Sequence, residues 1–256
     1  MWSKLLGGRV KRTIKAGFHL MGLEVSRLPR SGQGSRQSQV ARENPLAGVK
    51  IQPWFQDDHV VAFLRQGRGR SALTPEALYI LIELLDYAAD LPGNAAEFGV
   101  WRGGSAVLLA KRLEQRAPDK VLHLLDTFQG CPETDPSKDN YYRKGDFADT
   151  SLAEVQEFLK DVSAQIKFHV GLFQETVHEM ADEIFCFAHV DCDIYSSVMY
   201  ATEFVYPRMA VGGVIVYDDY GWEDCAGARL AVDEFYADKS AHPIYLPTSQ
   251  CIIIKR

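Results

Sequence analysis

From residue 74 onward, helical and strand-like segments alternate along the chain with short breaks between them. The strand-like segments are continuous apolar runs, which is typical of a parallel sheet covered by helices on both faces. We expect helices at 74–90, 104–117, 151–162, from about 174, at 195–209 and at 227–238, and strands at 95–100, 121–127, 166–172, 184–191 and 212–219.

Two of these helices begin with recognisable capping residues. Thr74 precedes Pro75, a residue that suits the first position of a helix because its missing N–H would be unpaired there anyway. Ser151 and Glu154 have the spacing of a capping box. Both starts support the helical reading of the segments that follow.

Two more strand-like segments, 243–247 and 249–256, are joined too closely for a helical crossover. We expect them to form an antiparallel hairpin at the edge of the sheet. The predicted fold is therefore α/β, with a doubly wound, mostly parallel, seven-stranded sheet whose last strand is antiparallel. This is the Rossmann-like layout of class I S-adenosylmethionine-dependent methyltransferases.

The first 30 residues form a separate, basic segment. Its apolar residues recur at steps of three and four, which predicts an amphipathic helix. Seven Lys and Arg residues against one Glu give it a charge near +6, although the whole chain carries −6. Two interpretations stay open: residues 1–29 contact an anionic membrane surface, or the helix packs on its own domain or on a second subunit of a homo-oligomer.

The length, composition and net charge of the chain limit the classes of protein to which it can belong. The chain of 256 residues divides into the basic helix (1–30), a linker and substrate-side or lid segment (31–73), and a methyltransferase domain (74–256). The negative net charge argues against nucleic acid as a partner. Neither a membrane span nor a signal peptide is recognisable, and five scattered cysteines favour a reducing cytoplasm. The membrane interpretation would place the protein on the inner face.

A glycine-containing stretch, "EFGVWRGGS", follows the first predicted strand. Gly99 leaves the strand, and Gly103 and Gly104 allow backbone to approach a ligand where the next helix starts. The spacing resembles methyltransferase motif I more than the pattern of dinucleotide enzymes. We expect Glu97, Gly99, Gly103, Gly104 and Ser105 to contact the cofactor, S-adenosyl-L-methionine. The alternative is a tight turn that binds no ligand.

Asp126 ends the second predicted strand. A carboxylate at this position can accept hydrogen bonds from both ribose hydroxyls of a nucleoside, so Asp126 is a further candidate cofactor contact. The alternative is that this aspartate caps a turn.

Two apolar strands end in acids: "AHVDCD" and "VIVYDDY". Because strand ends of a parallel sheet share one edge, we expect Asp191, Asp218 and Asp219 to converge there. Three adjacent carboxylates repel at pH 7, and such a cluster must raise some pKa values or hold a cation. Oxygen-only ligands suit Mg²⁺, which lowers the pKa of a bound hydroxyl.

Two residues close to Asp191 in the sequence, Asp193 and His189, are interpreted as structural residues rather than as metal ligands. Asp193 precedes a predicted helix, so we interpret it as a helix cap rather than a ligand. His189 lies on the same strand face as Asp191, and we favour a hydrogen-bonded interior histidine over a residue that supports the site.

Five segments together resemble the macrocin O-methyltransferase family: "AEFGVWRGGSA", "LLDTFQGCPET", "HVDCDIYSS", "GGVIVYDDYG" and "GARLAVDEFYAD". The resemblance covers about residues 70–256 and implies Mg²⁺-dependent methyl transfer from S-adenosylmethionine to a sugar hydroxyl. It also implies that Asp191 is a metal ligand and the general base, that Asp218 and Asp219 are further ligands, and that Glu97, Gly99 and Asp126 contact the cofactor.

The expected acceptor is a sugar in a glycosylated natural product or in a bacterial polysaccharide or glycolipid. Within the loop 128–149, a candidate lid, Tyr141, Tyr142 and Arg143 either contact the sugar or are merely exposed. Two other functions stay open: a catechol-type small-phenol O-methyltransferase, and a non-catalytic, membrane-associated binding protein on the same scaffold.

Overall fold

The computed structural model describes residues 53–55, 57–67 and 69–256. The predicted basic helix, residues 1–30, lies outside the described residues, as does the linker up to residue 52. The described residues belong to one compact unit, Gln52–Arg256. Within them, no helix is both long enough and apolar enough to span a bilayer.

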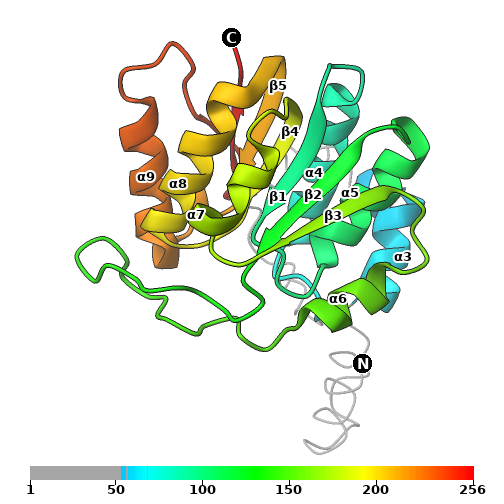
Figure 1. Cartoon of the computed structure of the whole chain (residues 1–256), viewed down its shortest axis with the longest axis horizontal. Coiled ribbons are helices and arrows are strands. Elements are labelled where there is room, and N and C mark those ends of the chain that lie inside the picture. The colour runs from blue at the N-terminus through cyan, green and yellow to red at the C-terminus, as the bar shows by residue number, and fades with distance from the viewer. Residues whose placement is uncertain (1–52, 56, 68) are drawn as a thin grey trace, which may run out of the picture. The chain divides into compact units, whose positions relative to one another are not determined.

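A seven-stranded sheet forms the centre of this unit (Figure 1). Its spatial order is β3-β2-β1-β4-β5-β7-β6, and β1 to β5 are parallel, whereas β7 runs antiparallel to both β5 and β6. This confirms the predicted fold class, including the reversed last strand. The strands are β1 Asn94–Phe98, β2 Val121–Asp126, β3 Gln165–Val170, β4 Phe185–Val190, β5 Met209–Tyr217, β6 Ile244–Tyr245 and β7 Cys251–Ile254.

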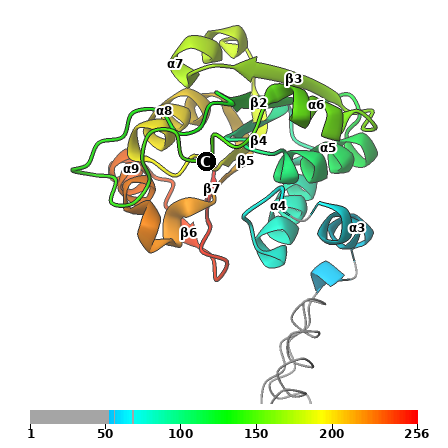
Figure 2. The same cartoon turned by 90° about the horizontal axis from the view of Figure 1, so that it is seen from below.

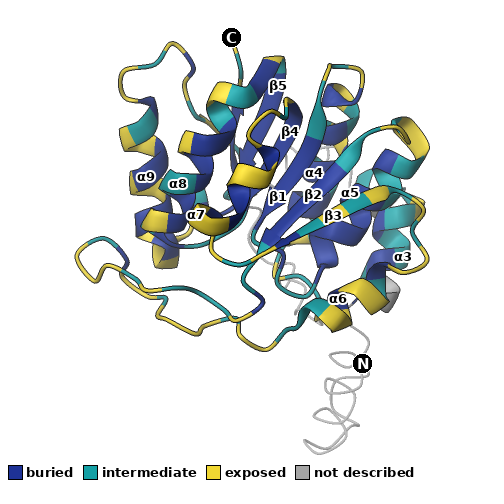
Figure 3. Ribbon diagram, viewed as in Figure 1, coloured by how far each residue is buried: buried dark blue, intermediate teal, exposed yellow. Residues whose placement is uncertain are grey.

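Helices cover both faces of the sheet (Figure 2). One buried cluster joins the sheet to α3, α4, α5 and α6, and a second cluster joins the other face to α7, α8 and α9. Figure 3 shows the resulting dark interior between the two helical layers. The helices are α3 Asp58–Gln66, α4 Pro75–Ala88, α5 Gly104–Arg116, α6 Leu152–Leu159, α7 Phe173–Thr176, α8 Tyr195–Val205 and α9 Ala226–Tyr236.

The predicted helix starts are confirmed by hydrogen bonds. The Thr74 hydroxyl accepts from the backbone N–H of Ala77 at 3.2 Å, and Pro75 is the first residue of α4. The Ser151 hydroxyl accepts from the N–H of Glu154 at 3.3 Å. These caps satisfy N–H groups that the first turn of a helix leaves unpaired.

Two predicted helices differ from the observed elements. The helix expected from about residue 174 is only the single turn α7, continued by the 3₁₀ turn Val177–Met180. The helix predicted for 195–209 ends at Val205, because Pro207 cannot continue the hydrogen-bonded ladder, and a 3₁₀ turn Tyr206–Arg208 follows. Neither difference moves a strand end.

The segment that precedes residue 74 contributes a helix to the same core. In α3, Val60 and Phe63 are buried in the cluster that includes α4 and α5. Arg112 of α5 forms ion pairs with Asp57 at 2.5 Å and with Asp86 of α4 at 2.9 Å. Helix α3 is therefore attached to the sheet through both packing and charge.

Candidate active site

The strand order reverses between β1 and β4, and this is where doubly wound sheets bind ligands. A cavity of about 590 Å³ opens at the carboxyl ends of the strands around this point. Its volume is within the usual range for small-molecule sites. The predicted site residues that line it are Gly99, Ser105, Asp126, Asp191, Asp218 and Asp219.

Gly99 is required where the backbone after β1 closely approaches the backbone after β4. Its φ is +89°, and a Cβ built there would lie 1.7 Å from the backbone oxygen of Asp191. Only a residue without a side chain fits both the left-handed backbone and this approach. Gly99 thus brings the backbone that carries Asp191 directly against the turn after β1.

Three of the expected cofactor contacts lie outside the cavity lining. Glu97 is fully buried, and His189 Nδ1 lies 2.8 Å from its Oε1. Gly103 faces Val155, and a Cβ on Gly104 would lie 2.5 Å from the backbone oxygen of Arg70. This geometry does not support a direct contact between a ligand in the cavity and Glu97, Gly103 or Gly104, and the glycines instead permit close packing of neighbouring segments.

Asp126 caps the turns around it, which was the alternative to a cofactor contact, and it also lines the cavity. Its Oδ2 accepts from the backbone N–H groups of Val100 and Trp101, at 2.7 and 2.9 Å, and its Oδ1 accepts from that of Phe128 at 2.6 Å. Each carboxylate oxygen has two lone pairs, so Oδ2 is fully used and one acceptor position remains, on Oδ1. The carboxylate both fixes the turn after β1 and faces the crevice.

The acids at the ends of β4 and β5 converge as expected. Carboxylate oxygens of Asp191, Asp218 and Asp219 can lie within 4.8 Å of one another, a spacing suited to a metal ion. Burial, followed by the charges of Asp218 and Asp219, raises the pKa of Asp191 well above its ordinary value. Among the described residues, no lysine or arginine forms an ion pair with any of these three carboxylates.

The helix-cap prediction for Asp193 is wrong. The N-cap of α8 is Ile194, and the N–H of Tyr195 is bound instead by Asp139 Oδ1 at 2.8 Å, from the loop after β2. Asp193 adopts φ +59° and lines the cavity, and its backbone N–H donates to Asp219 Oδ2 at 2.8 Å. The chain bends sharply after β4, which aims Asp193 into the site rather than at the helix.

His189 is the hydrogen-bonded interior histidine that the sequence favoured, and it also faces the acids. Its Nε2 lies 3.9 Å from Asp218 Oδ1, which is beyond hydrogen-bond distance. Burial opposes its protonation, but the nearby carboxylate of Asp218, the contact with Glu97 and the charge of Asp191 raise its pKa well above the ordinary value. His189 therefore places positive charge behind the carboxylates.

The second wall of the cavity comes from loops. Tyr142 and Phe147, whose rings lie 5.3 Å apart, line it from the loop after β2, whereas Trp222 lines it from the turn after β5. Tyr141 is 59% exposed and does not line the cavity. Sequence reasoning missed Trp222, because one tryptophan in a polar turn has no distinguishing pattern.

The raised pKa of Asp219 predicts a pH dependence of stability. Burial and the Asp218 charge raise this pKa to about 7, from 3.8. Between these two pKa values, the folded state holds a proton that the unfolded chain has released. The free energy of unfolding therefore falls as pH rises from about 4 to about 7, by about 1 kcal/mol per pH unit. In EDTA, chemical unfolding at pH 5 and pH 7 should show this fall in wild type relative to Asp219→Asn.

The comparison of wild type with Asp219→Asn removes the contributions to the pH dependence that both proteins share. His123, whose pKa burial lowers to about 4, has the opposite effect on stability below pH 6.5, but it is common to both proteins. Parallel pH profiles for wild type and Asp219→Asn would contradict the raised pKa.

Comparison with known proteins agrees with this geometry. The macrocin O-methyltransferase (TylF) family matches residues 79–250. Demethyldecarbamoylnovobiocin O-methyltransferase from Streptomyces niveus is 29% identical over 58% of this chain and 60% of its own length. Mycinamicin III 3''-O-methyltransferase from Micromonospora griseorubida is 31% identical over 57% of this chain and 61% of its own length.

The chain thus spans about 60% of the length of the curated relatives it matches. Among solved structures, the O-methyltransferase NovP superposes with a TM-score of 0.64 at 25% identity, covering 73% of this chain and 82% of NovP. The family match includes the strand ends that form the cavity, from Gly99 to Asp219. The chain belongs to the macrocin O-methyltransferase family.

Proposed function

We propose that this protein transfers a methyl group from S-adenosyl-L-methionine to a hydroxyl of a sugar, in a glycosylated natural product or a bacterial polysaccharide or glycolipid. The observation that carries the proposal is the convergence of Asp191, Asp218 and Asp219 beside the Gly99 crevice, with no lysine or arginine paired to them among the described residues. Membership of a family of sugar O-methyltransferases supports the reaction type.

The cofactor side of the proposed site is formed by Gly99, Ser105 and Asp126. S-adenosylmethionine supplies a methyl group that its sulfonium already activates. The protein has to orient that methyl group toward the acceptor oxygen and keep water away. Asp126, held by three backbone N–H groups, keeps one acceptor position, on Oδ1, for a ribose hydroxyl.

The metal side fits Mg²⁺ in its donor atoms. Asp191, Asp218 and Asp219 would hold the ion through hard carboxylate oxygens. Burial and the crowding of negative charge raise the pKa values of Asp191 and Asp219, and a cation would relieve the repulsion between these charges. When bound, Mg²⁺ lowers the pKa of a coordinated hydroxyl and so makes a better nucleophile of it.

Two carboxylates are candidates for taking the hydroxyl proton. Asp191 is the residue that the sequence indicated. Asp193 is the second candidate, because it lines the same cavity and its side chain has no hydrogen-bond partner among the described contacts. A carboxylate that holds a cation is a weaker base, which favours Asp193 if Asp191 is fully used as a ligand.

The acceptor side of the proposal uses the loop wall. Tyr142, Phe147 and Trp222 offer aromatic faces on which the C–H face of a sugar can pack. Asp224 lies on the same wall and can accept a hydrogen bond from a sugar hydroxyl. The loop 128–149 is the proposed lid over this space.

Removal of divalent cations is the direct test. In isothermal titration calorimetry, the protein should bind S-adenosylmethionine, and turnover with a glycoside panel should be lost in EDTA and restored by MgCl₂. A parallel panel of catechols distinguishes a small-phenol enzyme, which would turn over catechols and not glycosides. If the protein did not bind S-adenosylmethionine, the proposed enzymatic function would be contradicted and a non-catalytic binding protein would be favoured.

The remaining expectations stay predictions. A cytoplasmic location is consistent with five free thiols in the described structure. Membrane contact or subunit contact through residues 1–29 concerns a segment outside the described residues.

A further inference from the structure

The geometry points to two positioning residues for the carboxylate set, Gln250 and Cys225. Each fixes one of the adjacent acids, Asp218 or Asp219, through a neutral donor that orients the carboxylate without cancelling its charge. The inference depends on the proposed function in one respect, namely that these carboxylates hold a divalent cation.

Gln250 reaches the site from the start of the antiparallel strand β7. Its side chain is fully buried, and its Nε2 donates to Asp218 Oδ1 at 2.9 Å and to the backbone oxygen of Ala77 at 3.4 Å. Its Oε1 accepts from the Thr248 hydroxyl at 2.8 Å. The side-chain amide thus links β7, the start of α4 and the end of β5.

The surroundings determine which way the amide points. The Ala77 carbonyl is only an acceptor, so the NH₂ end of Gln250 must face Ala77 and Asp218, and the Thr248 hydroxyl is free to donate to the other end. Asp218 itself is 7% exposed. A buried carboxylate held by a fixed amide has little freedom to rotate away from its neighbours.

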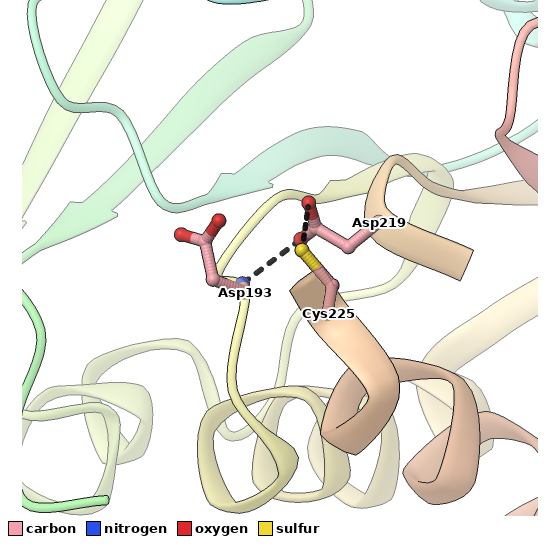
Figure 4. A group of neighbouring side chains, drawn as sticks. All are labelled: Asp193, Asp219 and Cys225. Atoms are coloured by element: carbon pink, nitrogen blue, oxygen red, sulfur yellow. Dashed lines mark hydrogen bonds between the residues drawn. The ribbon is translucent and has the colours of Figure 1, made fainter. Parts of the chain in front are cut away.

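Asp219 is held from two sides (Figure 4). The Asp193 backbone N–H donates to Oδ2 at 2.8 Å, and the Cys225 thiol donates to Oδ1 at 3.6 Å. Cys225 is 3% exposed and directly precedes α9. A thiol carries one S–H and is a weak donor, so the Cys225 side chain can orient Asp219 without bringing a positive charge.

The choice of neutral donors is informative because the chain uses arginine elsewhere. Asp57 at the start of α3 and Asp86 of α4 share the guanidinium of Arg112 of α5, so positive charge is supplied directly to these acids. In the cavity, the groups that donate hydrogen bonds to Asp218 and Asp219 are an amide, a thiol and a backbone N–H, and the positive charge of His189 lies farther away, 3.9 Å from Asp218. Donors of this kind leave the negative charge available to a bound cation, and partners of metal ligands commonly act in this way.

Mn²⁺ binding tests the inference without any turnover. Electron paramagnetic resonance titrations of the full chain, in the absence of cofactor and acceptor, should give a Kd that rises by about 10- to 100-fold in Gln250→Leu and in Cys225→Ala. Cys225→Ser, which keeps a donor, should retain most of the wild-type affinity. Gln250→Glu keeps the size of the side chain but places a carboxylate against Asp218, and should also bind Mn²⁺ more weakly.

S-adenosylhomocysteine binding, measured by calorimetry, distinguishes positioning from loss of the fold. The variants should bind it as wild type does, since the hydrogen bonds of Gln250 and Cys225 go to Asp218, Asp219, Ala77 and Thr248 and not to Asp126. Gln165→Leu, the same change on exposed strand β3, is the control and should leave both affinities unchanged.

Two results would overturn the inference. One is wild-type Mn²⁺ affinity in both Gln250→Leu and Cys225→Ala. Where Gln250→Leu does not fold, wild-type affinity in Gln250→Glu counts in its place, and where Cys225→Ala does not fold, a loss of affinity in Cys225→Ser overturns the inference. The other is a wild-type protein that binds S-adenosylmethionine but not Mn²⁺. That result would also remove the metal from the proposed function, while methyl transfer in EDTA would show that the reaction itself survives.

Discussion

Asp191→Asn is expected to lower kcat by about 10²- to 10⁴-fold, and to weaken divalent-cation binding at the same time. The reason is that Asp191 lies at the centre of the carboxylate set, at the end of β4, where the Asn amide can neither take a proton nor offer a charged ligand. Steady-state turnover at saturating S-adenosylmethionine, with an Mn²⁺ titration of the same preparation, measures both effects.

Asp193→Asn is the matched control, because it removes a carboxylate two residues away. If Asp193 takes the proton, this variant loses turnover but keeps Mn²⁺ affinity, whereas Asp191→Asn loses both. If Asp191 fills both roles, Asp193→Asn retains most of the turnover. Near-normal turnover of Asp191→Asn in EDTA would rule out the metal-and-base mechanism.

Gly99→Ala is expected to lower the free energy of unfolding by about 3 to 5 kcal/mol, which is large for a single methyl group. The methyl group would occupy the space of the Asp191 backbone oxygen, which lies 1.7 Å from the Cβ position. Gly99 and Asp191 directly follow β1 and β4, and their backbone N–H groups donate to Leu125 and Phe98 of the neighbouring strands, so neither can move without breaking these hydrogen bonds. Urea unfolding monitored by circular dichroism measures the change.

Gly145→Ala separates the close approach from the backbone conformation. Gly145 has φ +87°, nearly the same as Gly99, but a Cβ there meets no atom within 4 Å. This control should cost only the left-handed conformation, about 1 kcal/mol. If the two variants lost equal amounts of unfolding free energy, the close approach of the Asp191 backbone would not be the reason that Gly99 is needed.

The fold and the floor of the site were predictable because both follow from local pattern. Continuous apolar runs separated by helices fix a parallel sheet, and a parallel sheet brings its strand ends to one edge. That argument predicted the convergence of Asp191, Asp218 and Asp219 without any knowledge of distances. Gly99 and Asp126 followed from the same reasoning, since each lies at the end of a neighbouring strand.

The structure departs from the sequence expectations at Asp193 and Glu97, for two different reasons. Asp193 follows the strand in a left-handed conformation, so its position before a helix did not make it a cap. Glu97 lies inside the strand, where its register partner on β4 is His189, and the two side chains hydrogen-bond each other rather than a ligand.

Other site residues have partners too distant in sequence to be recognised. Gln250 binds an acid 32 positions earlier, and a single glutamine at the start of a strand carries no signal of that contact. Cys225 follows its partner by six positions in an irregular turn, where spacing predicts neither contact nor direction.

Asp139 has a further consequence for how members of this family can diverge. It lies in the loop after β2, yet it caps α8, and a Cβ on Gly227 of α9 would lie 2.0 Å from its Oδ1. The loop that supplies the aromatic wall is therefore also a structural part of the helical layer. A loop transplanted from a relative to change acceptor choice has to bring an equivalent acid with it, so recombination among such proteins is constrained by a helix cap as well as by the fit of the substrate.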